Sequence, residues 1–465
     1  MPGRSRRRRR WRRDQIRVAD PADVRRSIRG TAIGNFMEWY DFGVYGYLAT
    51  TIARVFYPGA GSLIGAFATL AAAFAMRPLG GLVFGPLGDR IGRKRVLVTT
   101  LVLMTLGTAA TGLLPGYRAI GVAAPILLIA TRMVQGFSAG GEYVGAMVYV
   151  GEHAPDSKRG MMAGFLPMSS QAGYVVAGAL VTGLQTWLSD EAMLSWGWRI
   201  PLLLSAPLGL VALYLRLRLD ESPAFRQSGG GRGDGSGDDD SAAAQLRRTA
   251  RQWRPVALCV ALVLTYNVTD YLLTGYLPSY LQTSARIPYP GGLLLIVLTL
   301  LAMMGTVVPM ARLSDHIGVK PVLWSGAIML VALSVPAFML ISSAANYLVA
   351  FAGVALIGAM LLCFDATLPA TLPALFPTRV RYGALAIGFN LSVSAFGGTT
   401  PLAAEALVSR TGNPLAPAYL LIAAGVIGAM ALVFTPEVAG RRLPGSGPAV
   451  ESEAQARELV EGRDG

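Results

Sequence analysis

The chain has 465 residues, of which 53% are hydrophobic and only 15% charged, and its formal net charge at pH 7 is +14. Soluble domains contain about 25% charged residues, so this composition excludes an ordinary soluble domain and predicts a protein that crosses a membrane many times. The two cysteines, Cys259 and Cys363, both lie inside apolar runs. They cannot form a disulfide framework or a zinc-binding spacing, so we predict two buried thiols and no metal site.

Residues 1–30 form a basic segment that contains the run RSRRRRRWRR at 4–13. Such a run is compatible with nucleic-acid binding, with a twin-arginine export signal or with a lipid surface. The next apolar run begins near Thr31 and contains acids, unlike the apolar core of an export signal. We therefore expect a cytoplasmic tail attracted to anionic lipid headgroups, at about 1 kcal/mol per base, and no nucleic-acid partner.

Twelve apolar runs follow, each near the roughly 20 residues that a membrane-spanning helix needs. In chain order they lie at residues 31–53, 63–86, 96–115, 122–149, 161–187, 198–217, 255–281, 291–311, 321–342, 347–373, 382–406 and 416–435. The segment 220–254 contains GGGRGDGSGDDD, which is typical of a flexible linker. We predict an all-α membrane protein with twelve transmembrane helices in two six-helix halves, 31–219 and 255–437, around a central cavity, followed by a tail at 438–465.

Lysine and arginine mark one side of this bundle. The loops after spans 2, 4, 8 and 10, the linker after span 6 and the segment after span 12 are basic, whereas the opposite loops hold only scattered bases such as Arg54 and Arg286. Because basic loops stay in the cytoplasm, we expect both termini there, in a multi-pass protein of the cell membrane.

An internal repeat supports the division into halves. GPLGDRIGRKR at 85–95 recurs as ARLSDHIGVKP at 311–321, which places Asp89 over Asp315 and Gly92 over Gly318. Each copy follows the second span of its half. The two halves are therefore expected to be parallel repeats of one structure.

Ionisable residues inside the spans follow a pattern. Six of them lie well inside spans 1, 4, 7 and 10, namely Glu38, Asp41, Arg132, Glu142, Asp270 and Asp365. A buried charge in a membrane faces protein or water, so these spans should line a polar cavity and spans 3, 6, 9 and 12 should lie outside. The charges could instead form ion pairs that only fix helix register, but their recurrence in the first helix of each triplet favours a transport pathway.

Several stretches together resemble the metabolite–proton symporter branch of the major facilitator superfamily. They include GNFMEWYDFGVYGYLA, MRPLGGLVFGPLGDRIGRKR, QGFSAGGEY, WGWRIP and LPALFPTRVRYGALAIGFN, and the likeness runs from about residue 29 to 437. NVTDYLLTGYLPSYL and TLPALFPTRVRY are most similar to the proline/glycine-betaine symporters of that branch. The resemblance implies a monomeric secondary transporter that works by alternating access, driven by a proton gradient and without a cofactor.

The same resemblance implies a cytoplasmic latch that holds the halves together when the cavity faces outward. Its residues here are Gly85, Asp89, Arg90, Gly92, Arg93 and Lys94, with Asp315 in the second copy. The bases also fit a simple positive-inside loop. Two departures stand out: Asp270 and Asp365 replace residues that are usually uncharged in proline/betaine members, and the tail is too short for a coiled coil, so osmotic regulation is not carried over.

Carboxylates are the candidates for proton coupling, because the two histidines, His153 and His316, lie outside the membrane spans. Burial and a nearby arginine shift the proton affinity of a carboxylate in opposite directions. We predict coupling by Glu38, Asp41 and Glu142, opposed by Arg132 and Arg77.

The mixture of charges favours a small zwitterion such as proline or glycine betaine, which needs a cation for its carboxylate and an acid or ring face for its ammonium. The candidate binding residues are Arg132, Arg77, Asp270, Asp365, Tyr45, Asn267, Tyr271 and Asn390. A proton symporter for a dicarboxylate, tricarboxylate or aromatic acid is the alternative. A drug–proton antiporter fits less well, because span 5 lacks a G-P-x-x-G-G pattern, and an enzyme would need a soluble catalytic domain that no inter-span segment can form.

Overall fold

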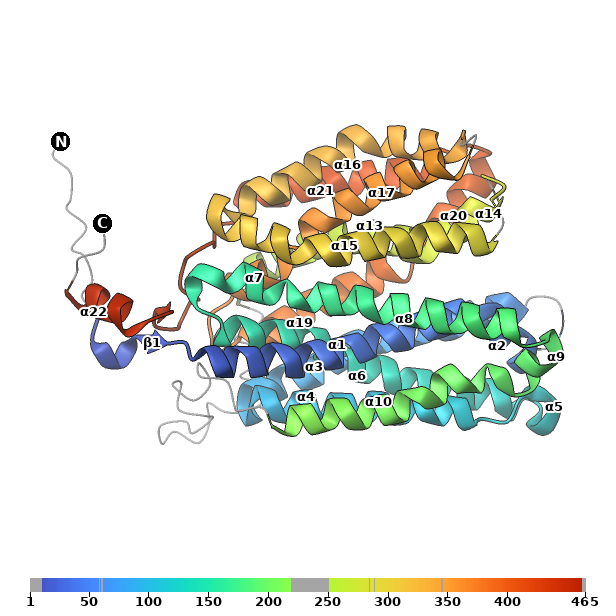
Figure 1. Ribbon diagram of the computed structural model, residues 1–465, viewed down its shortest axis with the longest axis horizontal. Helices are drawn as coiled ribbons and strands as arrows, with labels where there is room; N and C mark the ends of the chain where they lie inside the picture. The colour runs from blue at the N-terminus through green and yellow to red at the C-terminus, as the bar shows by residue number, and fades with distance from the viewer. Residues whose placement is uncertain are drawn as a thin grey trace.

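The computed structural model describes residues 11–57, 59, 62–218, 251–283, 285–287, 289–343 and 346–461. Part of the predicted arginine run and most of the predicted linker at 220–254 lie outside these residues, so their proposed roles stay predictions. The described chain is almost entirely helical (Figure 1).

The N-terminal tail and the N-terminal half together contain ten α-helices and three short helical turns among the described residues. They are η1 (Arg13–Gln15), α1 (Pro21–Tyr47), α2 (Ala49–Phe56), α3 (Ser62–Ile91), α4 (Arg93–Leu113), α5 (Tyr117–Ile120), α6 (Ala123–His153), η2 (Asp156–Lys158), α7 (Arg159–Ala163), α8 (Phe165–Trp187), α9 (Asp190–Ala192), η3 (Met193–Gly197) and α10 (Arg199–Leu217).

The C-terminal half repeats this plan. Its described elements are α13 (Trp253–Tyr271), η4 (Leu272–Tyr276), α14 (Leu277–Thr283), α15 (Tyr289–Ile317), α16 (Val319–Ser342), α17 (Tyr347–Asp365), α18 (Leu368–Thr371), η5 (Pro373–Leu375), α19 (Arg381–Ser392), η6 (Val393–Gly397), α20 (Thr400–Thr411) and α21 (Ala416–Phe434), followed by α22 (Glu453–Glu461) in the tail.

Eight described helical segments are long and apolar enough to cross a membrane. The other four predicted positions are filled by α1, α6, α8 and the interrupted pair α19–α20. Buried charges lower the hydropathy of α1 and α6. A π-helical turn (η6) divides the eleventh span into the short helices α19 and α20. The prediction of twelve helices in two halves is confirmed.

The first helix begins ten residues earlier than its apolar run. Asp20 caps α1 by accepting a hydrogen bond from the backbone N–H of Ala22 at 2.7 Å, and Pro21 occupies the first helical position. Both residues are typical helix starts. Apolarity alone therefore finds the membrane-crossing part of α1 but not its polar first turns.

Burial differs between some of the helices that are expected to lie inside and outside. Every residue of α1 from Met37 to Tyr45 is buried, although the segment carries two acids. In the apolar segment of α13, 72% of residues are buried, against 33% in the segment that ends in α10 and 39% in α16. These values agree with an inner position for spans 1 and 7 and an outer position for spans 6 and 9. They do not set span 3 apart, because its helix α4 is 50% buried, against 44% in the segment of span 2.

The two halves meet along helices that are distant in sequence. Figure 1 shows α8 and α15 side by side, and α19 lies against α3 of the N-terminal half. The repeat is visible in the backbone, because Gly92 and Gly318 precede α4 and α16 with φ of 105° and 99°. Side chains rarely adopt such angles, which explains a glycine in both copies.

Both terminal segments join at one end of the bundle, here called the tail face (residues 11–20 and 437–461). Strand β1 (Arg17–Val18) pairs in parallel with β2 (Ala449–Val450), and an Arg13–Glu453 ion pair of 2.5 Å lies beside them. Lys158 and Ser157 donate to Glu451 and hold the pKa of that carboxyl below its ordinary value. The C-terminal segment thus rests on a loop of the N-terminal half.

Candidate functional site

Glu38 and Arg77 form a fully buried ion pair between α1 and α3. Arg77 donates to Glu38 through Nη2, and both side chains are at most 1% exposed. The Arg77 guanidinium lies 5.3 Å from the ring centre of Phe42 and 5.6 Å from that of Phe74. Its Nε and Nη1 have no hydrogen-bond acceptor among the described residues, so this guanidinium keeps donors for a further anion.

Asp41 is held by neutral donors rather than by a direct ion pair. Thr108 donates to its Oδ2, and Gln135 Nε2 donates to the same oxygen at 3.0 Å. Arg132 donates to Gln135 Oε1 at 2.5 Å and lies 4.2 Å above the ring of Tyr45. The Tyr45 hydroxyl donates to the carbonyl of Ala66 at 2.9 Å. Arg132 and Tyr45 are therefore built into the N-terminal half around Asp41.

Glu142 has a partner that the sequence analysis missed. Arg216 near the end of α10 donates to both of its oxygens, one of them at 2.9 Å, and Thr100 of α4 donates at 2.6 Å. Arg216 and Glu142 have 0% side-chain exposure. The expected opposition of Glu142 to Arg132 and Arg77 does not occur; its carboxylate joins α4, α6 and α10.

Asp270 and Asp365 come together at a small cavity between the halves. The cavity is lined by Trp39, Pro167, Ser170, Gln171, Tyr174, Tyr266, Asp270, Leu300, Met303, Leu361 and Asp365. Its lining contains no basic residue, so Arg132 and Arg77, which are expected to bind the same substrate, do not line it. Its volume of about 10 Å³ is near the roughly 10–15 Å³ that one water molecule requires, so the cavity has room for about one water molecule.

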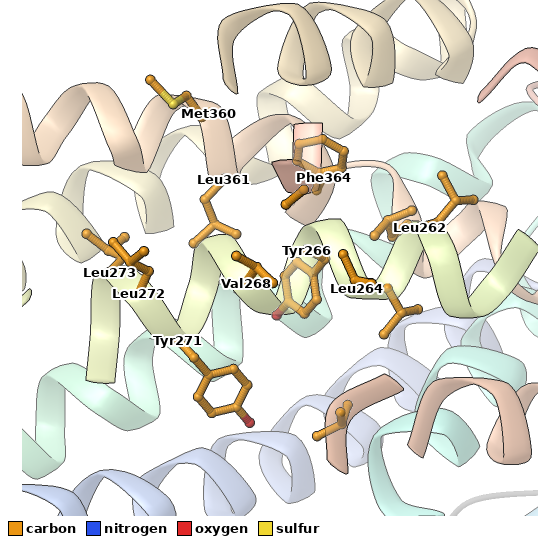
Figure 2. Packing of buried hydrophobic residues seen from close by; sticks show 14 of the residues in the cluster. Leu262, Leu264, Tyr266, Val268, Tyr271, Leu272, Leu273, Met360, Leu361 and Phe364 are labelled. Carbon is orange, nitrogen blue, oxygen red and sulfur yellow. The ribbon is translucent and has the colours of Figure 1, made fainter. Parts of the chain in front are cut away.

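A hydrogen bond between the two halves lies at this cavity. Gln171 of α8 donates through Nε2 to Oδ2 of Asp365 on α17 at 2.9 Å. Figure 2 shows the surroundings of α13, the helix that carries Asp270. Leu361 and Phe364 of α17 pack against α13, while Tyr271 of α13 points away from α17. The Tyr271 ring meets Phe74 of the N-terminal half edge-on at 5.5 Å. The cavity therefore lies at the interface that alternating access would open and close.

Two other predicted binding residues lie elsewhere. Asn390 donates to the carbonyl of Gly140 at 2.6 Å, so it joins α19 to α6 across the interface. Asn267 is buried on α13, and its Nδ2 has no acceptor among the described residues. Neither residue lines the cavity that contains Asp270 and Asp365.

The first loop motif contacts the opposite half through Asp89. Its Oδ2 accepts a hydrogen bond from the backbone N–H of Gly383, in the first turn of α19, at 2.9 Å. Arg93 Nη2 lies 3.0 Å from Oδ1 of the same carboxylate. A side chain at Gly85 would place its Cβ 2.8 Å from the Cα of Gly383, so glycine is needed for this approach. Arg90 is exposed and Lys94 partly buried.

The second copy of the motif makes the equivalent contact from the C-terminal half to the N-terminal half. Asp315 at the end of α15 accepts hydrogen bonds from the backbone N–H groups of Gly160 and Met161, in the first turn of α7, both at 2.8 Å. A carboxylate at the N-terminal end of a helix is favoured electrostatically. Each repeat thus binds a helix start of the opposite half.

An ion-pair chain continues this latch. Arg93 Nε lies 3.5 Å from one oxygen of Glu152, and Arg381 Nη1 lies 2.7 Å from the other. Arg381 also donates to the carbonyl of Pro444 in the tail at 2.7 Å. The tail face is therefore closed by contacts between both halves and the tail.

We expect Asp89→Asn and Asp315→Asn each to favour opening of the tail face. A hydrogen bond to a charged group contributes about 1.5–3 kcal/mol, so the ratio of open to closed molecules should rise about tenfold or more. Labelling of cysteines introduced at each end of the cavity would report the ratio. Arg90→Gln, next to Asp89 at the end of α3 but exposed, is the control. An unchanged ratio in both aspartate variants with full transport would contradict this role.

Two helical halves that meet at a buried polar cavity, with reciprocal contacts closing one end, define a secondary transporter rather than an enzyme. The family described as "Sugar (and other) transporter" matches residues 29–445. The proline/betaine transporter of Salmonella typhimurium is 42% identical over 451 residues, covering 96% of this chain and 90% of that protein. The glycine betaine/proline/ectoine/pipecolic acid transporter OusA of Dickeya dadantii is 41% identical over 454 residues, with the same coverage.

The chain belongs to this transporter family, within the major facilitator superfamily. Solved structures agree on the fold. The proton:xylose symporter XylE has a TM-score of 0.74 at 18% identity, covering 91% of this chain and 98% of that one. The fucose:proton symporter FucP of E. coli has a TM-score of 0.66 at 14% identity, covering 89% and 99%.

Proposed function

We propose that this chain takes up a small zwitterion, such as proline or glycine betaine, together with protons. The observation that carries the proposal is a combination of charges near one interface. Asp270 and Asp365 line a cavity without a basic residue, and Arg77 has donors without an acceptor among the described residues. Acids suit the ammonium of a zwitterion and the arginine suits its carboxylate. The relatives named for proline and betaine support the same class of substrate.

Glu38 is the proposed proton carrier, and its partner Arg77 couples proton binding to substrate binding. While Glu38 is ionised, it holds one edge of Arg77. Protonation removes that charge and releases Arg77 to bind a carboxylate. Proton and substrate then bind together, and each raises the affinity for the other. Asp41, with Gln135 and Arg132 behind it, is proposed as a second coupling acid, whereas we assign Glu142 no coupling role.

The same proposal covers location and partners. The basic loops and both terminal segments lie at the tail face, which supports a cytoplasmic position for that face in the cell membrane. The closed latch then corresponds to a state that does not open to the cytoplasm. The transporter would act as a monomer, use the proton gradient without a bound cofactor, and approach anionic lipid headgroups through its basic N-terminal residues.

Uptake of labelled proline into proteoliposomes with an imposed pH gradient tests this proposal. We expect unlabelled proline and glycine betaine to compete, and citrate and 2-oxoglutarate not to compete, because a second carboxylate would meet Asp270 and Asp365. Competition by a dicarboxylate with none by either zwitterion would contradict the proposal and favour an organic-acid symporter.

A further inference from the structure

Three buried hydrogen-bond donors at the interface of the two halves have no acceptor. They are Nε and Nη1 of Arg77, on α3, and the hydroxyl of Tyr271, at the end of α13, and none of them has a hydrogen-bond partner among the described residues. The Arg77 side chain is 1% exposed and Tyr271 is 7% exposed. Buried donors are costly to leave unpaired, so this arrangement favours a ligand that brings acceptor atoms.

Phe74 of the N-terminal half lies against both residues. Its ring centre is 5.6 Å from the guanidinium carbon of Arg77 and 5.5 Å from the centre of the Tyr271 ring. The Arg77 and Tyr271 side chains are also close enough to interact with each other. Because a guanidinium has no acceptor atom, Arg77 cannot take the hydroxyl proton of Tyr271, and that proton still needs an acceptor.

The Tyr271 ring is packed between the two halves. Figure 2 shows it pointing away from α17, and Phe74 meets it from α3. On the side of its own half, a Cβ at Gly397 would lie 2.8 Å from Cε2 of the ring, so this position requires a glycine. The π-helical turn η4 begins at the next residue, and such turns are frequent at functional sites. The C-terminal half therefore presents the hydroxyl of Tyr271 to α3 of the N-terminal half.

We infer that Tyr271 and Arg77 bind the substrate carboxylate together, one from each half. A carboxylate has two acceptor oxygens, enough for a guanidinium and a hydroxyl at once. Asp270 directly precedes Tyr271, with the two Cα atoms about 3.8 Å apart, and Asp270 lines a cavity with Asp365. A small zwitterion can thus direct its ammonium, methylated or not, toward the acids and its carboxylate toward Tyr271. This inference rests on the proposed function and assigns the recognition of the carboxylate to a residue of each half.

The test is Tyr271→Phe, which removes the hydroxyl and keeps the ring beside Phe74. The variant should fold and melt like the unmodified chain, because this hydroxyl has no partner among the described residues. In proteoliposomes we expect the KM for labelled proline to rise about tenfold or more, the size expected for losing a hydrogen bond to a charged group. The maximal rate should stay within about twofold. Glycine betaine, which also has a carboxylate, should lose a similar factor as a competitor.

Prolinamide separates loss of carboxylate binding from general damage to the site. It keeps the ring and the ammonium of proline but has no carboxylate, so its strength as a competitor should change less than about twofold in Tyr271→Phe. Tyr280→Phe is the matched control. It also removes a buried tyrosine hydroxyl of the C-terminal half, but one that donates to the carbonyl of Pro414 at 2.7 Å, and it should leave the KM for proline unchanged.

The outcomes separate this inference from the proposed function. An unchanged KM in Tyr271→Phe would overturn the inference, and so would an equal loss for proline and prolinamide. If prolinamide does not compete even with the unmodified protein, the division between KM and maximal rate decides, and a fall in maximal rate without a rise in KM counts against Tyr271. No uptake of proline and no competition by glycine betaine in the unmodified protein would instead mean that the proposed function is wrong.

Discussion

Replacing Glu38 with glutamine is expected to abolish accumulation of substrate driven by a pH gradient. The amide keeps the size and one acceptor of the carboxylate, but it cannot bind and release a proton. Arg77 would then stay available to substrate at any pH, so exchange of labelled for unlabelled substrate at equal concentrations should persist. We expect Asp41→Asn to lose accumulation as well.

The matched control is Glu142→Gln. It also neutralises a buried acid, but one bound by Arg216 and Thr100 inside the N-terminal half. Folded Glu142→Gln protein should still accumulate substrate against its gradient. Both kinds of transport would be measured in the same proteoliposomes, with and without an imposed pH difference. Normal accumulation by both Glu38→Gln and Asp41→Asn would remove the coupling assignment.

Removing Arg216 is expected to cause the largest loss of stability. Arg216→Met leaves the Glu142 carboxylate buried without its cation, and breaking a buried ion pair in this way costs about 3–5 kcal/mol. We expect a fall in folded yield and in the melting temperature of the purified protein in detergent.

The double variant Arg216→Met/Glu142→Gln removes both charges and should recover part of the loss, because no isolated charge remains. A double-mutant cycle of melting temperatures would show this coupling. If Arg216→Met melts like the unmodified chain, or if the two substitutions simply add, the pair does not hold α6 to α10 as described.

Much of the fold could be predicted because hydropathy and charge act over whole helices. The apolar runs predicted the positions of the helices, and the repetition of Asp89 at Asp315 predicted the two halves. In the structure, each of these aspartates accepts a hydrogen bond from a backbone N–H at the start of a helix in the opposite half. Asp270 and Asp365 are expected to line one polar cavity, and both line the cavity between the halves. Their buried positions follow from the rule that membrane charges face protein or water.

The partners of these buried charges could not be predicted, because a partner depends on the orientation of each helix about its axis and on the residue at which the helix ends. Arg216 stands at the last turn of an apolar run, where a base commonly reaches the membrane surface, yet its side chain turns inward to Glu142. Gln171 has no charge and gave no signal in the sequence. The pairing of β1 with β2 involves only two residues from each end of the chain, too few for any strand pattern.

The most direct test of the central claim is substrate-dependent proton entry into proteoliposomes that contain a pH-sensitive dye. With no imposed pH difference, adding proline outside should acidify the interior in the unmodified protein, and Glu38→Gln should show no acidification while still exchanging proline. Proline entry without acidification, or acidification on adding citrate but not proline, would contradict proton-coupled uptake of a zwitterion.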